Sequence, residues 1–214
     1  TWTGTGSAGS IAHGLGAVPK FITIKNRTDG STNWRVYHGG TGASDPETDY
    51  MYLNLNNALS DGVYMNDTAP TSSVFSVGTH ADVNTSTKNY VAYLWVEIEG
   101  YQKFGKLTGD GNANGTYVHC GFQPFFVIIK QSSATGDWNM IDTTRQGHNH
   151  ANGLPVIRAN SGAVEDQASG NQGQIDILSN GFKLRSNHSS FNTSGATIVY
   201  MAWAKMPEKY SLAF

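Results

Sequence analysis

The chain has 214 residues, of which 14% are charged, and its formal net charge is −2. Soluble globular proteins carry roughly 25% charged residues, so this sequence is poor in charge. The balance gives no electrostatic reason to expect nucleic acid or an anionic membrane as a partner. The longest apolar run, Tyr90–Val96, is too short to cross a bilayer, so we expect no membrane insertion.

The first distinct element along the chain is a predicted strand over residues 21–25, FITIK. Aromatic and β-branched residues dominate it, Pro19 precedes it, and a polar turn follows it. This pattern is typical of a buried strand. Trp34 then begins the next strand. Helical periodicity is weak and reaches one turn at most, in LNNALSDGV.

The second half of the chain repeats the elements of the first half. Three segments return in the same order about 105 residues later: PKFITIK at Pro19 as PFFVIIK at Pro124, Trp34 as Trp138, and YVAYLWVE at Tyr90 as IVYMAWAK at Ile198. We therefore predict an all-β chain of two tandem β-sandwich (jelly-roll-like) domains, residues 1–101 and 102–214, produced by an internal duplication.

The last strand of each half is apolar on both faces. Alternation places Tyr93 and Trp95 together on one face of the first strand, and Trp203 on the matching face of the second. A sheet with one face in water alternates apolar with polar residues, so these side chains need a cover. A loop or the sister domain would provide it. Alternatively, Tyr93, Trp95 and Trp203 form the interface of a homo-oligomer.

Motifs for catalysis give an enzyme no positive support. GTGSAG at Gly4 matches the dinucleotide pattern G-x-G-x-x-G, but no helix follows, so we interpret it as a turn. The single cysteine, Cys120, leads into a strand and is interpreted as a core residue. Four carboxylates could form a hydrolytic pair, but nothing beyond their residue type makes them candidates: Asp137, Asp142, Glu165 and Asp166. We expect no enzymatic activity and no cofactor.

Two segments contain residues that bind metals elsewhere. His148 and His150 lie two positions apart in GHNHANG, which is the spacing of a shared metal on a strand, but the flanking Gly and Asn indicate a loop. Asp45, Glu47 and Asp49 could supply oxygen ligands to calcium, but the EF-hand pattern is absent. We therefore predict no metal site, with the two histidines as weak candidates.

Two other segments combine aromatic rings with polar side chains, as carbohydrate sites do. They are NWRVYHGG and DWNMID, and the candidate ligand-binding residues are Trp34, Arg35, Tyr37, His38, Trp138 and Asp142. Because both tryptophans stand at the start of a corresponding strand, a structural role is the alternative interpretation.

Several long motifs resemble a repeated domain of virion proteins of tailed bacteriophages, common in phages of aquatic bacteria. They are HGLGAVPKFITIKNR, NWRVYH, NDTAPTSSVFSVGT and NYVAYLW in the first half, and GFQPFFVIIKQSSATGDWNMIDT, LSNGFKLRSN and NTSGATIVYMAWA in the second. The resemblance covers nearly the whole chain. Such proteins are usually called tail fibre or tail proteins. The resemblance implies no catalytic residue, and it implies a homotrimer with other virion proteins as partners.

These observations predict a non-enzymatic phage virion structural protein, a tail-fibre or adhesin region that contacts host-surface glycans. A chain with no possible internal disulfide and no signal-peptide pattern fits assembly in the host cytoplasm and display on the virion surface. The alternative is a purely structural capsid-decoration or fibre-forming protein. A polysaccharide-degrading enzyme has the least support. We expect a receptor surface in the variable loops, around residues 45–49 and 148–173.

Overall fold

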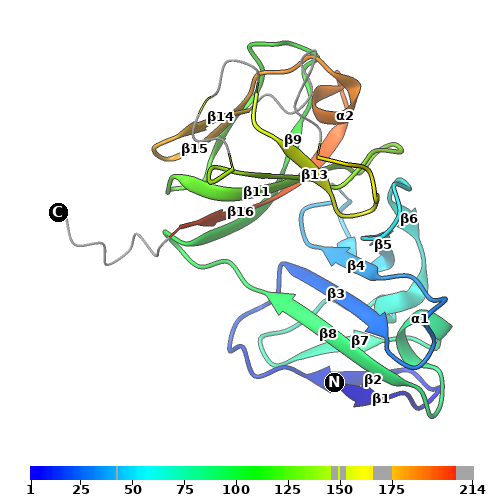
Figure 1. The fold of residues 1–214 in the computed structure, drawn as a ribbon. Coiled ribbons are helices and arrows are strands. Elements are labelled where there is room, and N and C mark those ends of the chain that lie inside the picture. The colour runs from blue at the N-terminus through cyan, green and yellow to red at the C-terminus, as the bar shows by residue number, and fades with distance from the viewer. Residues whose placement is uncertain (42, 146–148, 150–152, 166–174, 206–214) are drawn as a thin grey trace. The chain divides into compact units, whose positions relative to one another are not determined.

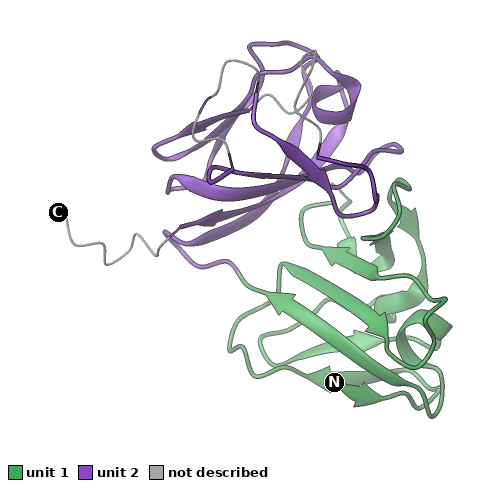
Figure 2. Cartoon of the chain, in the orientation of Figure 1, with its two compact units in different colours: residues 1–96 green, residues 97–214 purple. Residues whose placement is uncertain are grey.

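The computed structural model describes the chain except for residues 42, 146–148, 150–152, 166–174 and 206–214. The described residues form two compact units, residues 1–96 and 97–214 (Figures 1 and 2). Antiparallel strands are the main regular structure of both units, and the described helices are all short. None of these helices is long and apolar enough to cross a membrane.

Unit 1 consists of two antiparallel sheets. The larger sheet has the strand order β1 (Trp2–Thr3), β8 (Asn89–Trp95), β3 (Phe21–Asn26), β4 (Arg35–His38), β5 (Asp49–Tyr52) and β6 (Ser60–Asp61). The smaller sheet pairs β2 (Gly9–Ala12) with β7 (Val74–Val77), and the connections contain η1 (Pro46–Thr48), η2 (Val63–Met65) and α1 (Ala81–Asn84). Ile22, Phe75 and Tyr90 bring both sheets into one core, so the unit is a β-sandwich.

Unit 2 has the same architecture. Its larger sheet has the strand order β13 (Val156–Arg158), β12 (Asn139–Asp142), β11 (Pro124–Gln131), β16 (Thr197–Ala204) and β9 (Gln102–Thr108). Its smaller sheet has the order β10 (Tyr117–His119), β15 (Gly181–Leu184) and β14 (Ile175–Leu178), and α2 (Ser189–Asn192) precedes β16. Val127, Phe182 and Tyr200 belong to the core between the sheets. The prediction of an all-β sandwich fold is confirmed.

The central strands of the two units pair in the same register. Phe21 faces Trp95 across β3 and β8, and Phe126 faces Trp203 across β11 and β16. Other pairs correspond in the same way: Asn26–Tyr90 to Gln131–Ile198, Ile22–Tyr37 to Val127–Ile141, and Thr3–Asn89 to Thr108–Thr197. This agreement supports the hypothesis of an internal duplication, which stays a prediction.

The boundary between the two units lies after residue 96 of the chain, whereas the sequence pattern predicts a boundary after residue 101. Ile98 forms an antiparallel bridge with Gln102 at the start of β9. The carbonyl of Tyr101 accepts a hydrogen bond from the N–H of Ala204 at the end of β16. Residues 97–101 therefore belong with the sheet of unit 2, although they break the apolar pattern of the sequence.

A histidine caps each of the two α-helical turns. Nδ1 of His80 accepts from the N–H of Asp82 in α1, and Nδ1 of His188 accepts from the N–H of Ser190 in α2. Each helix has four residues, which is too short to show a helical period in the sequence. The sequence pattern therefore does not predict them.

A buried asparagine ends each of these helices and joins segments that are remote in sequence. The Asn84 carboxamide accepts from the N–H of Thr5 and donates to the carbonyls of Ser7 and Gly78. Asn192 makes the three corresponding bonds, to the N–H of Asp110 and the carbonyls of Asn112 and Ser186. Each side chain thus pairs three backbone groups, which would be costly to leave unpaired inside the protein.

The glycine motif at Gly4 has a steric role. The N–H of Gly4 donates to the carbonyl of Lys88 at 2.7 Å, and a Cβ atom at Gly4 would collide with the carbonyl of Thr85. Gly109 lies against Thr193 in the same way in unit 2. Strand β2, rather than a helix, follows Gly4, so the structural context of a dinucleotide site is absent.

Replacing Gly4 by alanine should destabilise unit 1, because the new methyl group must displace the Thr85 carbonyl. Overpacking of this kind costs about 1–3 kcal/mol. Gly30→Ala is the matched control, since no heavy atom lies within 4 Å of the added methyl. Chemical unfolding followed by circular dichroism measures both variants. Equal stabilities of Gly4→Ala and Gly30→Ala would contradict the steric explanation.

Candidate functional site

A row of aromatic rings lies on the outer face of the larger sheet of unit 1, the face turned away from the core. Ala92 and Leu94 of β8 pack against the core, so Tyr93 and Trp95, which alternate with them, lie on the opposite face. Trp34, immediately before β4, stacks on Tyr93 with ring centroids 6.3 Å apart and planes inclined by 24°. We call Trp34, Tyr93 and Trp95 the aromatic face.

The aromatic face is partly open to solvent. The rings of Tyr93 and Trp95 are 6.4 Å apart, and Trp95 is 5.2 Å from Phe21, which it faces across the sheet. Tyr93 is 50% exposed, and Trp34 and Trp95 are partly buried. One surface therefore brings together Trp34, predicted as a ligand-binding residue, and Tyr93 and Trp95, predicted as oligomer contacts.

The other candidates in NWRVYHGG are buried, although His38 shares the outer side of the sheet and packs against Phe21, with ring centroids 6.1 Å apart. Arg35 and Tyr37 alternate with Trp34 and are buried on the core side of β4. His38 is also buried, and its Nδ1 accepts a hydrogen bond from the N–H of Gly40. Burial argues against direct contact between these three side chains and a glycan.

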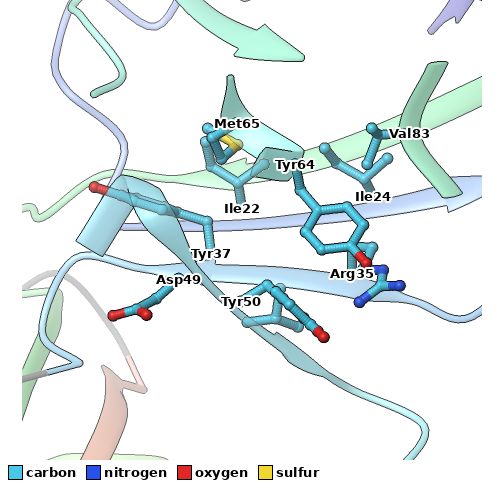
Figure 3. Close-up of a pocket in the computed structure, with 10 residues that line it drawn as sticks. Ile22, Ile24, Arg35, Tyr37, Asp49, Tyr50, Tyr64, Met65 and Val83 are labelled. Carbon is cyan, nitrogen blue, oxygen red and sulfur yellow. The ribbon is translucent and has the colours of Figure 1, made fainter. Parts of the chain in front are cut away.

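Arg35 lies on the core side of β4, with the ring of Tyr64 beside it (Figure 3). Its Nε donates to a carboxylate oxygen of Asp82 in α1 at 2.5 Å. Its guanidinium carbon lies 3.8–4.4 Å from the ring centroids of Tyr50, Tyr52 and Tyr64. The ion pair and the cation–π contacts together offset the cost of burying the charge.

The pocket beside Arg35 (Figure 3) is too small for a sugar. Its volume is about 10 Å³, which is the size of one water molecule, and Nη1 of Arg35 makes no hydrogen bond to the described residues. Burial raises the pKa of Tyr64 to about 12, although Arg35 acts in the opposite direction. The phenol therefore stays neutral at physiological pH. We interpret this cluster as internal support for β4 and hence for Trp34.

Unit 2 differs at the positions that correspond to these candidates. Trp138 is 0% exposed, which argues against stacking on a sugar. Asp142 accepts from the N–H groups of Thr144 and Arg145 and pairs with the Arg145 guanidinium at 2.5 Å. Partial burial would raise the pKa of Asp142, but these hydrogen bonds outweigh it and lower the pKa. Asp142 therefore stabilises its own turn.

Trp203 occupies the place in unit 2 that Trp95 occupies in unit 1. Its ring stacks on Phe126 with centroids 5.4 Å apart and meets Phe104 edge-on at 5.7 Å. Its Nε1 donates to Oε1 of Gln102 at 3.1 Å. The predicted interface residue thus lies in a second aromatic cluster, on the larger sheet of unit 2, where its ring is only partly buried.

The remaining candidates are the carboxylates of the predicted hydrolytic set and the residues that could bind a metal. The described carboxylates of the predicted hydrolytic set form ion pairs: Asp137 with Arg158, and both Asp142 and Glu165 with Arg145. Asp166, His148 and His150 lie outside the described residues. In the described part of the chain, no group of three His, Cys, Asp or Glu residues could hold a metal ion, and this includes the acidic loop Asp45–Asp49.

Cys120 is a core residue, as the sequence predicts. Its side chain belongs to the apolar cluster between the sheets of unit 2. Burial raises the pKa of the thiol to about 12, with a small opposing effect from Lys103. The thiolate required of a nucleophile is therefore scarce at physiological pH.

Removing the charge partner of Arg35 should strongly destabilise unit 1. Asp82→Asn leaves a buried guanidinium without its counter-charge, which costs about 3–5 kcal/mol. The double variant Arg35→Asn/Asp82→Ser introduces the residues found at the corresponding positions of unit 2, Asn139 and Ser190, and should lose much less. Thermal unfolding followed by tryptophan fluorescence compares them. A single variant as stable as the parent would contradict a stabilising pair.

Comparison with known proteins gives one match. The model of a family described as a domain of unknown function, DUF7483, matches residues 1–207 and therefore includes both units. No curated protein and no solved structure matches the chain.

Proposed function

We propose that this chain, which belongs to the DUF7483 family, is a non-enzymatic glycan-binding region of a phage virion protein. The aromatic face is the observation that carries this proposal. Its rings are held at stacking distances from one another and remain partly exposed. Exposed aromatic rings on a rigid sheet offer flat apolar surfaces to the C–H faces of sugars, at low cost in conformational entropy.

Uncharged polar groups adjoin the aromatic face, as sugar binding requires. Oδ1 of Asn54 accepts from the backbone N–H of Trp34 at 2.8 Å, and Nδ2 of Asn54 donates to Oδ1 of Asn33 at 2.8 Å. These bonds fix the start of β4 and place two amides next to the backbone of Trp34. Amides donate and accept hydrogen bonds, so they match the hydroxyl groups of a neutral glycan.

The virion context rests on the sequence motifs that resemble tailed-phage proteins. A fold of two like β-sandwiches with uncharged polar loops agrees with an exposed particle component. We propose a tail-fibre or adhesin region displayed on the virion surface after assembly in the host cytoplasm. Antibodies raised against the chain should label intact phage particles, and failure to label them would contradict this location.

Trp34→Ala and Tyr93→Ala should each weaken binding to a host polysaccharide by about tenfold or more, because each removes a stacking surface. Tyr93→Phe keeps the ring and should retain binding. Biolayer interferometry against a panel of purified bacterial capsular polysaccharides and lipopolysaccharides measures the affinities. Val164→Ala, at a residue 88% exposed in unit 2, is the control. Absence of binding by the assembled protein to the whole panel would overturn the proposal.

A purely structural role is the second candidate, and the same rings favour it. Half-exposed Tyr93 beside Trp95 is an apolar patch of the kind that subunit interfaces cover. In that case the chain forms an oligomer, and Tyr93→Lys should dissociate it because a charge would be buried in the contact. Sedimentation equilibrium measures the mass. A parent chain that remains monomeric at high concentration would count against this candidate.

A further inference from the structure

Unit 2 has a surface hollow away from the groups considered so far. The hollow has a volume of about 270 Å³ and is lined by Gly121, Phe122, Gln123 and Ser179. Three of these residues belong to the connection between β10 and β11, and Ser179 belongs to the turn between β14 and β15. Pockets for drug-sized ligands start at roughly 300 Å³, so this hollow suits one smaller unit.

Two exposed rings lie on β10, the strand that leads into the hollow. Tyr117 and His119 flank Val118 of β10, which points into the core, so their side chains share the outer face of the strand. Their ring centroids are 6.5 Å apart, and Tyr117 is 42% exposed. Cε1 of His119 lies 4.0 Å from the position that a Cβ atom on Gly121 would take. The His119 ring therefore borders the wall of the hollow.

Asn180 ties the two sides of the hollow together. Its Oδ1 accepts from the hydroxyl of Tyr117 at 2.7 Å. Its backbone carbonyl accepts from the N–H groups of Cys120 and Gly121, at 2.8 Å and 3.1 Å. The ring and the two loops are thus fixed in the absence of a ligand, which reduces the entropic cost of binding.

The chemistry of the hollow is polar and uncharged. Gln123, Ser179 and Asn180 are exposed and provide amide and hydroxyl groups that donate and accept hydrogen bonds. None of the four lining residues carries a formal charge. Lys183 faces Tyr117 across β10 and β15, and Lys103 is near enough to counter slightly the burial that raises the pKa of Cys120, but neither lysine lines the hollow.

We propose that this hollow binds one neutral sugar unit, with Tyr117 and His119 as ring contacts and Gln123, Ser179 and Asn180 as hydrogen-bonding groups. This inference rests on the proposed glycan-binding function and adds a second binding point to it. A polysaccharide held at the hollow and at the aromatic face would dissociate more slowly than from either point alone, provided that its length allows both contacts.

Unit 1 lacks the rings at the corresponding positions. The Ser10–Ser76 pair of β2 and β7 corresponds to the Tyr117–Lys183 pair of β10 and β15. In the same register, Ala12 corresponds to His119. The double variant Tyr117→Ser/His119→Ala therefore introduces residues that the same register already accommodates in unit 1. Because both side chains of the parent point outward, we expect the variant to fold.

The test is a titration of the ¹⁵N-labelled protein with millimolar glucose, galactose, mannose or N-acetylglucosamine, with glucuronate as a charged comparator. The expected result is that at least one neutral sugar shifts the backbone amide signals of Gly121, Gln123 and Ser179. These shifts should disappear in Tyr117→Ser/His119→Ala and persist in Trp34→Ala. No shift with any neutral sugar, unchanged shifts in the double variant, or a response to glucuronate alone would overturn the inference.

The same variants separate this inference from the proposed function. Suppose that Trp34→Ala abolishes polysaccharide binding and Tyr117→Ser/His119→Ala leaves it unchanged. This result would support binding at the aromatic face and contradict binding at the hollow. Suppose instead that sugars shift the Gly121 signal and Trp34→Ala has no effect on polysaccharide binding. This result would support binding at the hollow and contradict binding at the aromatic face.

Discussion

In each unit, one buried carboxamide joins the first and the last passage of the chain between the two sheets. In unit 1, the chain first leaves the larger sheet through the segment that contains Thr5 and Ser7, and it returns for the last time through Gly78 and α1. Asn84 bonds to both crossings at once, and Asn192 does the same in unit 2. Because backbone groups at both crossings share one partner, neither can move without breaking buried hydrogen bonds.

The faces of the larger sheets are then determined by alternation. Residues that face the smaller sheet fill the core, and some of the residues on the other face, such as Tyr93, remain exposed. In β8 this divides Leu94 from Tyr93 and Trp95. The hollow in unit 2 has a different origin, because it lies where loops from the smaller sheet meet the start of β11. The two proposed binding points therefore use different parts of two similar β-sandwiches.

Much of the fold could be predicted from the sequence, because long apolar strands have a strong pattern. FITIK and FFVIIK are the cores of β3 and β11. The four-residue helices could not be found from periodicity, but HADVNT and HSSFNT repeat a histidine and an asparagine at fixed spacing. This repeat in the sequence indicates that the two segments share one local structure. Capping and burial explain it, since the histidine starts each helix and the asparagine ends it.

The candidate site was less predictable, because burial depends on distant partners. Strand alternation in NWRVYH predicts that Trp34 and Arg35 lie on opposite faces of the sheet. Because charged side chains are usually exposed to water, the pattern alone does not predict that Arg35 is the buried one. Arg35 is buried because Asp82, far along the chain, supplies its counter-charge. Trp34 and Trp138 correspond in sequence yet differ in exposure. The sequence pattern does not single out Tyr117 and His119, although YVH differs from the matching SIA of the first half.

The shared register also limits how such a chain can diversify. Inserting one residue within β8 would turn Tyr93 and Trp95 toward the core and expel Leu94. The same change in β16 would reverse the faces of that strand, so single-residue insertions in either strand should be eliminated by selection. Loops carry no such requirement and tolerate changes in length. Changes of ligand between relatives should therefore accumulate in the loops and in outward-facing side chains, while strand lengths stay constant.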